Sequence, residues 1–315
     1  MKIGVVSLGC AKNLVDTEIV LGFLSDAGHE FVSDPKEAEV IIVNTCGFIE
    51  AAKEESIQAI LEMASLKETG QCQGLVVMGC LSQRYSEELW KEIPEIDALL
   101  GTNELDLMVE IIAQVARGER VLKKRDAFFD YNQSYQRVST TGSHFAYLKI
   151  AEGCNHRCAF CVIPNIRGKM RSRSVESIMA EAQGLKEQGV QELAVIAQDT
   201  TAFGRDLGTD IVELLTKLAD LDIPWIRLLY TYPTSISDEL LELIDKRPNL
   251  VRYIDLPLQH VSANVLRKMG RPGSMESTKD LIRRIRTKIP GVTIRSSFIV
   301  GFPGEDNHSF EKTYE

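Results

Sequence analysis

Short apolar runs alternate with amphipathic stretches along the first third of the chain. Apolar runs of strand length lie at 2–8, 40–43 and 74–78, and helical periodicity follows at 13–27, at 50–66 and around 86–90. Strands that are apolar at nearly every position belong to parallel sheets with helices on both faces. The pattern therefore predicts an open, doubly wound α/β domain over residues 1–115.

The same alternation returns after residue 144 and continues to the end of the chain. Predicted strands lie at 145–150, 192–197, 225–230, 253–256 and 293–300, with helices between them at 175–187, 211–221, 238–245 and 277–287. Successive parallel units of this kind curl into a barrel or part of one, with reactive groups at the carboxyl ends of the strands. Residues 144–315 are thus predicted to form a partial barrel, and the loosely patterned residues 116–143 a linker.

The last residues, 310–315, read as the start of a further helix. A helix with no strand after it would leave one edge of the barrel sheet uncovered. We therefore expect the sequence to be a truncated form of a longer protein.

Composition places the protein among ordinary soluble chains of about two domains. It has 315 residues, of which 44% are hydrophobic and 26% charged. No apolar run approaches the roughly 18 residues of a membrane span, and the chain opens on a strand pattern rather than a signal peptide. These features predict a cytoplasmic protein with no membrane partner.

Charge is distributed unevenly. Residues 1–115 carry 7 Lys or Arg against 20 Asp or Glu, so their net charge is -13, whereas the whole chain carries -9. An acidic first domain repels the backbone of nucleic acids. This distribution counts against a large RNA-binding surface.

Three cysteines with the spacing C-x3-C-x2-C, namely Cys154, Cys158 and Cys161, directly follow the predicted strand at 145–150. Thiolates this close in sequence can all reach one soft metal centre, and a 4Fe-4S cluster has four irons to ligate. Three protein ligands leave one iron open for a small molecule. The spacing therefore indicates a catalytic cluster.

Two other interpretations of these three cysteines remain open. A zinc site needs a fourth ligand, and His156 lies inside the triplet, on a tight loop where it would not easily join the same tetrahedron. A redox disulfide would use only two of the three thiols. Seven cysteines in a chain without an export signal favour metal ligation over a disulfide framework.

A second group of cysteines is dispersed in sequence. Cys10, Cys46 and Cys80 each follow the carboxyl end of a predicted strand, 36 and 34 residues apart. Because the carboxyl ends of parallel strands share one edge of a sheet, we expect these thiols to converge. They predict a second three-cysteine 4Fe-4S cluster, although small apolar cysteines at strand ends remain the simpler alternative. Cys72 follows no strand and is interpreted as a spare thiol.

Basic residues follow the C-x3-C-x2-C loop. Four cations lie within residues 167–173: Arg167, Lys169, Arg171 and Arg173. Such a run is usually a solvated surface, but beside a cluster and an anionic ligand one or two of them are expected to contact a carboxylate, the sulfides or the substrate.

With both cysteine groups in view, the sequence resembles the methylthiotransferases of the radical S-adenosylmethionine (SAM) enzymes. The matching stretches are 7–16 (SLGCAKNLVD), 43–49 (VNTCGFI), 78–80 (MGC), 152–161 (EGCNHRCAFC), 256–260 (LPLQH) and 299–305 (IVGFPGE). The sequence of the first stretch is similar to that of the enzymes in this family that modify an aspartate of ribosomal protein S-twelve. The resemblance implies a radical SAM (β/α)6 TIM-like partial barrel, here ending before its last strand and before a carboxyl-terminal TRAM domain.

The resemblance also implies cofactors and a reaction. One cluster, on Cys154, Cys158 and Cys161, would bind and cleave SAM, and the resulting radical would abstract hydrogen from the β-carbon of the aspartate. The other, on Cys10, Cys46 and Cys80, would hold the sulfur that becomes the methylthio group. Gln198, Gln259 and Arg295 are possible SAM contacts, and no side chain is assigned as catalytic. An electron donor such as flavodoxin or ferredoxin and a sulfur donor are implied partners of a monomeric enzyme.

Three functional alternatives stay open at this point. A tRNA methylthiotransferase of the MiaB type uses the same chemistry on isopentenyladenosine. An electron-transfer or scaffold protein could merely store two clusters, and a zinc-binding interaction module could use the same cysteines. The open iron at both predicted clusters counts against the second of these.

Overall fold

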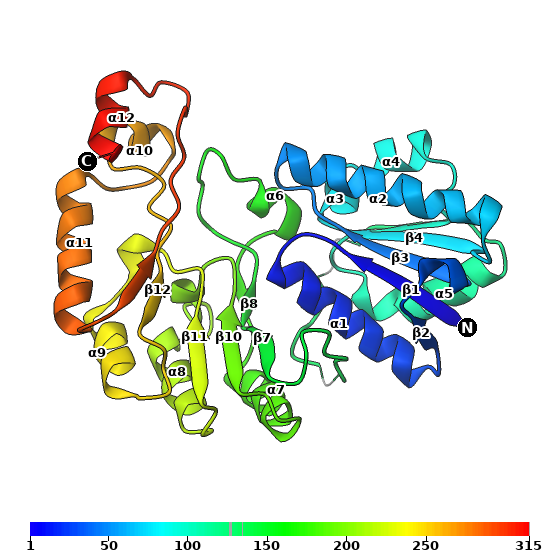
Figure 1. Cartoon of the computed structure of the whole chain (residues 1–315), viewed down its shortest axis with the longest axis horizontal. Helices are drawn as coiled ribbons and strands as arrows, with labels where there is room; N and C mark the ends of the chain where they lie inside the picture. Colours follow the sequence, from blue (N-terminus) through cyan, green and yellow to red (C-terminus); the bar gives the residue numbers. More distant parts are fainter. Residues whose placement is uncertain (126–127, 134, 315) are drawn as a thin grey trace. The chain divides into compact units, whose positions relative to one another are not determined.

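The computed structural model describes residues 1–125, 128–133 and 135–314. Within it the chain divides into two compact units (Figure 1). The first comprises Met1–Thr140 and Asn165–Arg167, and the second comprises Thr141–Pro164 and Gly168–Glu315.

The first unit is built on a six-stranded sheet of order β2-β1-β3-β4-β5-β6 in which all neighbours are parallel. Its strands are β1 (Lys2–Ser7), β2 (Glu30–Val32), β3 (Val40–Thr45), β4 (Gly74–Gly79), β5 (Ala98–Leu100) and β6 (Val121–Lys123). Every residue of β3 and β4 is buried, as expected of central strands covered on both faces.

Helices cover both faces of this sheet (Figure 1). They are α1 (Ala11–Asp26) and α5 (Met108–Ala116) on one face, and α2 (Glu50–Thr69), α3 (Cys80–Arg84) and α4 (Ser86–Glu92) on the other. The 3-10 turns η1 (Pro35–Glu37) and η2 (Leu105–Leu107) complete the connections. Ile41, Val43, Leu75 and Val77 form the centre of a core cluster on one face. The predicted doubly wound α/β domain is confirmed.

The second unit contains parallel strands with helices between them. The strands are β7 (Phe145–Lys149), β10 (Glu192–Ile196), β11 (Trp225–Leu228), β12 (Tyr253–Asp255) and β13 (Thr293–Arg295). They form the ladders β11-β10-β7 and β12-β13. The connecting helices are α7 (Val175–Glu187), α8 (Ile211–Ala219), α9 (Asp238–Lys246) and α11 (Met275–Lys288). This is the partial barrel that the periodicity predicts.

Side-chain caps fix where these helices begin. Ser174, Asp210, Ser237 and Ser274 each accept a hydrogen bond from a backbone N–H in the first turn of the helix that follows. The buried faces of the helices meet the strands in one apolar cluster that includes Leu148, Leu193 and Leu214. The caps and the cluster together hold the carboxyl ends of the strands in place.

Smaller elements surround the barrel strands. They are the antiparallel pair β8 (Ala151–Glu152) and β9 (Arg171–Ser172), the helices α6 (Ile163–Arg167), α10 (Ala263–Lys268) and α12 (Asn307–Tyr314), and the 3-10 turns η3 (Thr200–Ala202) and η4 (Pro233–Ser235). None of the helices in the described part of the chain is both long enough and apolar enough to cross a bilayer.

The structure differs from two of the predictions made from the sequence. The stretch 116–143, predicted to be a linker, contributes β6 to the first sheet, because Val121 and Leu122 continue the parallel ladder beside β5. Residues 126, 127 and 134 of that stretch lie outside the described residues. The strand expected over 293–300 ends at Arg295, and beyond it only one bridge, between Gln259 and Phe298, continues the pairing.

Candidate functional site

The three dispersed cysteines lie at one edge of the first sheet. Cys10 lies between β1 and α1, Cys46 directly follows β3, and Cys80 directly follows β4 as the first residue of α3. The strands β1, β3 and β4 are consecutive neighbours in the sheet. The carboxyl ends therefore present the three thiols together, as the sequence predicts.

Glycines allow the loops at this edge to approach one another closely. A Cβ added at Gly9 would lie 2.9 Å from Cβ and 3.3 Å from Sγ of Cys46. Gly79 has a φ of +101°, and a Cβ there would lie 2.2 Å from the side-chain oxygen of Asn44. Because any larger side chain would push these loops apart, the glycine that precedes Cys10 and the one that precedes Cys80 are structurally required.

Hydrogen bonds then fix the loop that carries Cys46. The hydroxyl of Ser56, on α2, accepts from the backbone N–H of Cys46 and donates to its carbonyl, both at 3.0 Å. Asn13, on α1, donates to the carbonyl oxygens of Thr45 at 2.8 Å and Leu8 at 3.2 Å. These bonds tie the loop that carries Cys46 to α2 and to the end of the strand before Cys10, while Cys80 contacts Asn13 through its thiol, which donates to the side-chain oxygen at 3.4 Å.

A buried arginine lies against this edge. Arg167 is only 3% exposed. It lies in the short segment Asn165–Arg167, which is part of the first unit, whereas the chain before and after this segment is part of the second. Its guanidinium donates to Asp16 at 2.7 Å, to the side-chain oxygen of Asn13 at 2.5 Å and to Sγ of Cys80 at 3.4 Å. It places a permanent positive charge beside a predicted ligand thiol.

Burial controls the acidity of these thiols. Desolvation raises the pKa of Cys80 to about 11, and the nearby guanidinium of Arg167 only partly offsets this. Desolvation also raises the pKa of Cys46, with a smaller contribution from the neighbouring Cys10. A buried thiolate is therefore costly here until a metal compensates its charge.

This shift predicts how the metal-free protein responds to alkali. An unfolded thiol ionises near pH 9, whereas Cys80 stays protonated in the folded chain up to about pH 11. Between these values the folded state binds more protons, so the free energy of unfolding falls as pH rises, by up to about 1.4 kcal/mol per pH unit. Urea unfolding at pH 8 and pH 10 should show a larger decrease in the free energy of unfolding for wild type than for Cys80→Ala. Equal decreases would contradict the raised pKa of Cys80.

The clustered cysteines lie on a loop of the second unit that begins after β8. The backbone N–H of Cys154 donates to Gly168 at 3.1 Å, and that of Cys161 donates to Cys158 at 3.0 Å. The N–H of Ala159 donates to Met269 at 2.9 Å, which attaches the loop to the end of α10. Desolvation raises the pKa of Cys154 to about 11 and also raises that of Cys161.

His156 has partners of its own within this loop. Its Nε2 lies 2.6 Å from Asp199, and its ring stacks on Tyr232 with centroids 3.7 Å apart and planes 7° apart. The structure thus engages the imidazole in a hydrogen bond and a ring stack. This agrees with the sequence argument that His156 would not easily be a fourth zinc ligand.

Arg271 supplies a cation to the clustered cysteines. Its guanidinium donates to Sγ of Cys158 at 3.7 Å and to the carbonyl of Pro257 at 3.0 Å, and it lies over the Tyr232 ring at 4.4 Å. Sequence reasoning missed this residue, because Gly270–Gly273 reads only as a turn. Each predicted cluster site therefore has one arginine within reach of one cysteine.

A buried polar network next to this loop includes Gln198, one of the expected SAM contacts. Glu152 accepts from Lys149 at 2.8 Å and also accepts a short hydrogen bond from Gln198. The other amide atom of Gln198, Oε1, is buried and has no hydrogen-bond partner among the described residues. Such an acceptor is available for a donor on a bound molecule.

The other two expected contacts also lie near strand ends. Gln259 follows β12 and has a φ of +73°, and Arg295 is the last residue of β13. The Arg295 side chain is 62% exposed and lies 3.8 Å from Asp255. The three residues are therefore placed as the sequence suggests, at carboxyl ends of barrel strands, but with different degrees of burial.

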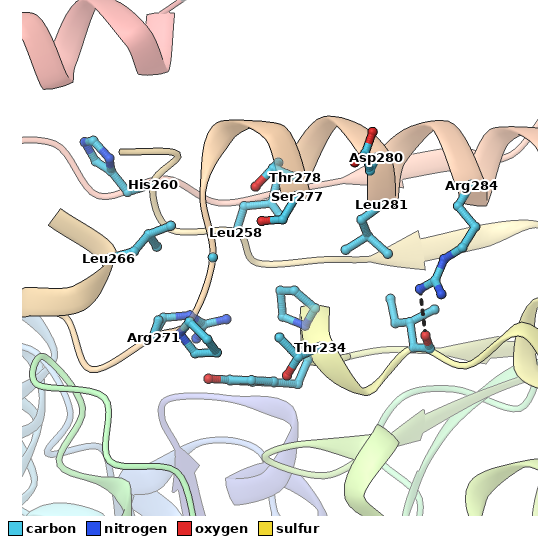
Figure 2. Close-up of a pocket in the computed structure, with 15 residues that line it drawn as sticks. Thr234, Leu258, His260, Leu266, Arg271, Ser277, Thr278, Asp280, Leu281 and Arg284 are labelled. Carbon is cyan, nitrogen blue, oxygen red and sulfur yellow. Dashed lines mark hydrogen bonds between the residues drawn. The ribbon is translucent and has the colours of Figure 1, made fainter. Parts of the chain in front are cut away.

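A cavity of about 430 Å³ adjoins this loop, and Figure 2 shows Arg271 and Thr234 on one side of it with Thr278 and Leu281 of α11 across from them. Arg284, also in its lining, donates to the carbonyl of Ile236 at 2.8 Å. The lining described by the structure does not include Gln198, Gln259 or Arg295. It does include Leu258 and His260, so the cavity lies next to Gln259 in the chain.

The thiols within each cysteine group lie close enough to affect one another. Cys10 raises the pKa of Cys46 and of Cys80, and Cys161 and Cys158 raise that of Cys154. Among residues 1–125, 128–133 and 135–314, no group of three or more His, Cys, Asp or Glu side chains is arranged to hold one metal ion.

Comparison with known proteins agrees with this arrangement. Residues 2–101 match the uncharacterized protein family UPF0004, and residues 148–315 match the Radical SAM superfamily. A Ribosomal protein uS12 methylthiotransferase RimO of Heliobacterium modesticaldum is 48% identical over 99% of this chain and 68% of its own length. The relative of the same name from Symbiobacterium thermophilum is 50% identical over 99% of this chain and 65% of its own length.

The chain belongs to the RimO family of radical SAM methylthiotransferases. It is accordingly a transferase whose cofactors are SAM and 4Fe-4S clusters. The family and the fold expected from the sequence are both confirmed.

Solved structures support the fold of this methylthiotransferase at low sequence identity. The radical SAM methyltransferase TsrM of Kitasatospora setae aligns with a TM-score of 0.70 at 16% identity, covering 99% of this chain and 70% of its own. The cobalamin-dependent radical SAM enzyme OxsB aligns with a TM-score of 0.65 at 12% identity, covering 99% and 51%.

Proposed function

We propose that this methylthiotransferase adds a methylthio group to the β-carbon of an aspartate in the ribosomal protein uS12. The observation that carries the proposal is the convergence of Cys10, Cys46 and Cys80 at one sheet edge, in a chain that also contains the C-x3-C-x2-C loop. A simpler radical SAM enzyme would need only the loop. The names of the relatives at 48–50% identity supply the substrate.

The six cysteines are proposed as the metal ligands, with Cys154, Cys158 and Cys161 holding the cluster that binds SAM. When bound, the clusters supply the electron and the sulfur that an unactivated C–H bond requires and that acid-base groups cannot provide. The chain's own residues position and shield these groups. Arg271 and Arg167 each place a positive charge beside one thiolate, which stabilises its ionised form.

Gln198 is proposed as a SAM contact because its buried Oε1 lacks a partner while Glu152 fixes its other amide atom. Replacing it with Ala removes that acceptor, so we expect the KM for SAM to rise about tenfold, as loss of one hydrogen bond to a charged ligand implies. Gln191→Ala is the matched control, because Gln191 is exposed and directly precedes β10 at the opposite end from Gln198. SAM-cleavage kinetics that are equal in the two variants would refute the contact.

Gln259 and Arg295 are proposed as further SAM contacts from their place at the ends of β12 and β13. The proposed activity also implies a cytoplasmic monomer. In that compartment the enzyme would meet its ribosomal substrate, a flavodoxin or ferredoxin as electron donor, and a sulfur donor.

The direct test incubates the reconstituted chain with SAM, a reductant, a sulfur source and either purified uS12 or unmodified tRNA. Mass spectrometry of the protein should show a methylthio group replacing hydrogen on one aspartate. Modified adenosine in the tRNA, with uS12 unchanged, would instead establish the tRNA methylthiotransferase activity. SAM left intact under reducing conditions would favour a protein that merely stores clusters.

A further inference from the structure

An apolar groove runs between α2 and α4 on the first unit. It encloses about 490 Å³, and its floor is formed by Leu81, Tyr85, Leu89 and Ile93. Ile57 and Leu61, on α2, line one wall and are 38% and 47% exposed. Large apolar side chains that line an open groove mark a binding surface more often than isolated exposed ones do.

The rim of this groove is acidic. Four glutamates line it, Glu50, Glu54, Glu88 and Glu92, and the single lysine in the lining, Lys53, is paired with Glu50. The surrounding residues 1–115 carry a net charge of -13. The groove therefore favours an occupant that combines apolar side chains with positive charge.

The groove also leads to the predicted auxiliary cluster. Leu81, in its floor, directly follows Cys80, and α2 begins four residues after Cys46. Between Cys46 and α2, Phe48 and Ile49 are 40% and 57% exposed. An extended segment in the groove would thus continue across apolar surface to the edge that holds Cys46 and Cys80.

We propose that the α2/α4 groove docks a basic, partly apolar segment of the ribosomal protein substrate next to the methylthio-donating site. This rests on the proposed function. Proteins of the ribosome bind RNA phosphates and are rich in Lys and Arg, so their charge complements the four glutamates. A second copy of this chain would bring the same acidic surface, and an RNA would bring phosphates, so both are disfavoured by charge.

The test compares the methylthiolation of purified uS12 by the cluster-loaded chain and its variants. The charge variant is Glu54→Lys/Glu88→Lys, and the apolar variant is Leu61→Ser. Glu110→Lys is the control, because Glu110 is also exposed but lies on α5, at the other face of the sheet. All of these positions are on the surface, and equal iron content would show that each variant folds and loads.

We expect the KM for uS12 to rise about tenfold in the charge variant and severalfold in the apolar variant, while SAM cleavage without uS12 stays at the wild-type rate. The charge variant should also lose part of the salt dependence of KM. Values equal to those of the control in both groove variants would overturn the proposal, as would a wild-type dimer that the groove variants dissociate. If wild type itself leaves uS12 unmodified, the proposed function fails instead.

Discussion

Replacing Cys10, Cys46 and Cys80 together with Ala should abolish methylthio transfer while the chain still cleaves SAM. The three thiols lie at one sheet edge of the first unit, and the C-x3-C-x2-C loop is held by backbone bonds of the second unit, to Gly168 and Met269. Because each unit has its own core, loss of one cysteine group should leave the other loop folded. The expected product is 5'-deoxyadenosine with no modified aspartate.

This result is measured by chromatography of the nucleoside products and mass spectrometry of uS12 in the same reaction. The control is Cys72→Ala, since Cys72 is buried in the apolar cluster beside β3 and β4, and its thiol donates to the carbonyl of Gly74. It should keep both activities. Methylthio transfer that survives in the triple variant would show that these thiols are structural.

Replacing Arg167 with Met should cost the first unit about 3–5 kcal/mol, the range for removing one partner of a buried ion pair. Asp16 is itself buried and pairs with Arg167 at 2.7 Å, so its charge would lose this compensation. Tyr131 donates to the other carboxylate oxygen at 2.9 Å, and this hydrogen bond is neutral. With total stabilities of about 5–15 kcal/mol, such a loss is severe.

The measurement is urea unfolding followed by circular dichroism, with Lys169→Met as the control. Lys169 carries the same charge two residues away but is exposed, so its loss should change stability by no more than about 0.5 kcal/mol. Arg167→Lys keeps the charge without the planar fork and should lie between the two. Equal unfolding midpoints for the Met variants would contradict the buried role of Arg167.

Much of the fold could be predicted because its strands are nearly continuous apolar runs. The run at 40–43 became β3 and the run at 74–78 became β4, both fully buried, and the cysteines that follow them share one sheet edge. The helices of the second unit begin close to the predicted positions, since capping residues such as Ser174 and Asp210 are visible in sequence.

What the sequence could not show depends on contacts between distant residues. Arg167 read as one of four cations on a solvated loop, yet it is buried among Asp16, Asn13 and Cys80, which are about 150 or 90 residues away in sequence. The strand β6 is only three residues long and flanked by charges, so it gives no periodic signal. Arg271 and Tyr232 meet Cys158 and His156 only through the tertiary fold.

The most direct test of the central claim, that the chain carries two independent clusters, is its iron and sulfide content after anaerobic reconstitution. The account predicts about eight irons per chain in wild type, and about four in the Cys154→Ala/Cys158→Ala/Cys161→Ala variant. About four irons in wild type and none in that variant would mean that Cys10, Cys46 and Cys80 hold no cluster. The proposed methylthio transfer would then have no second site.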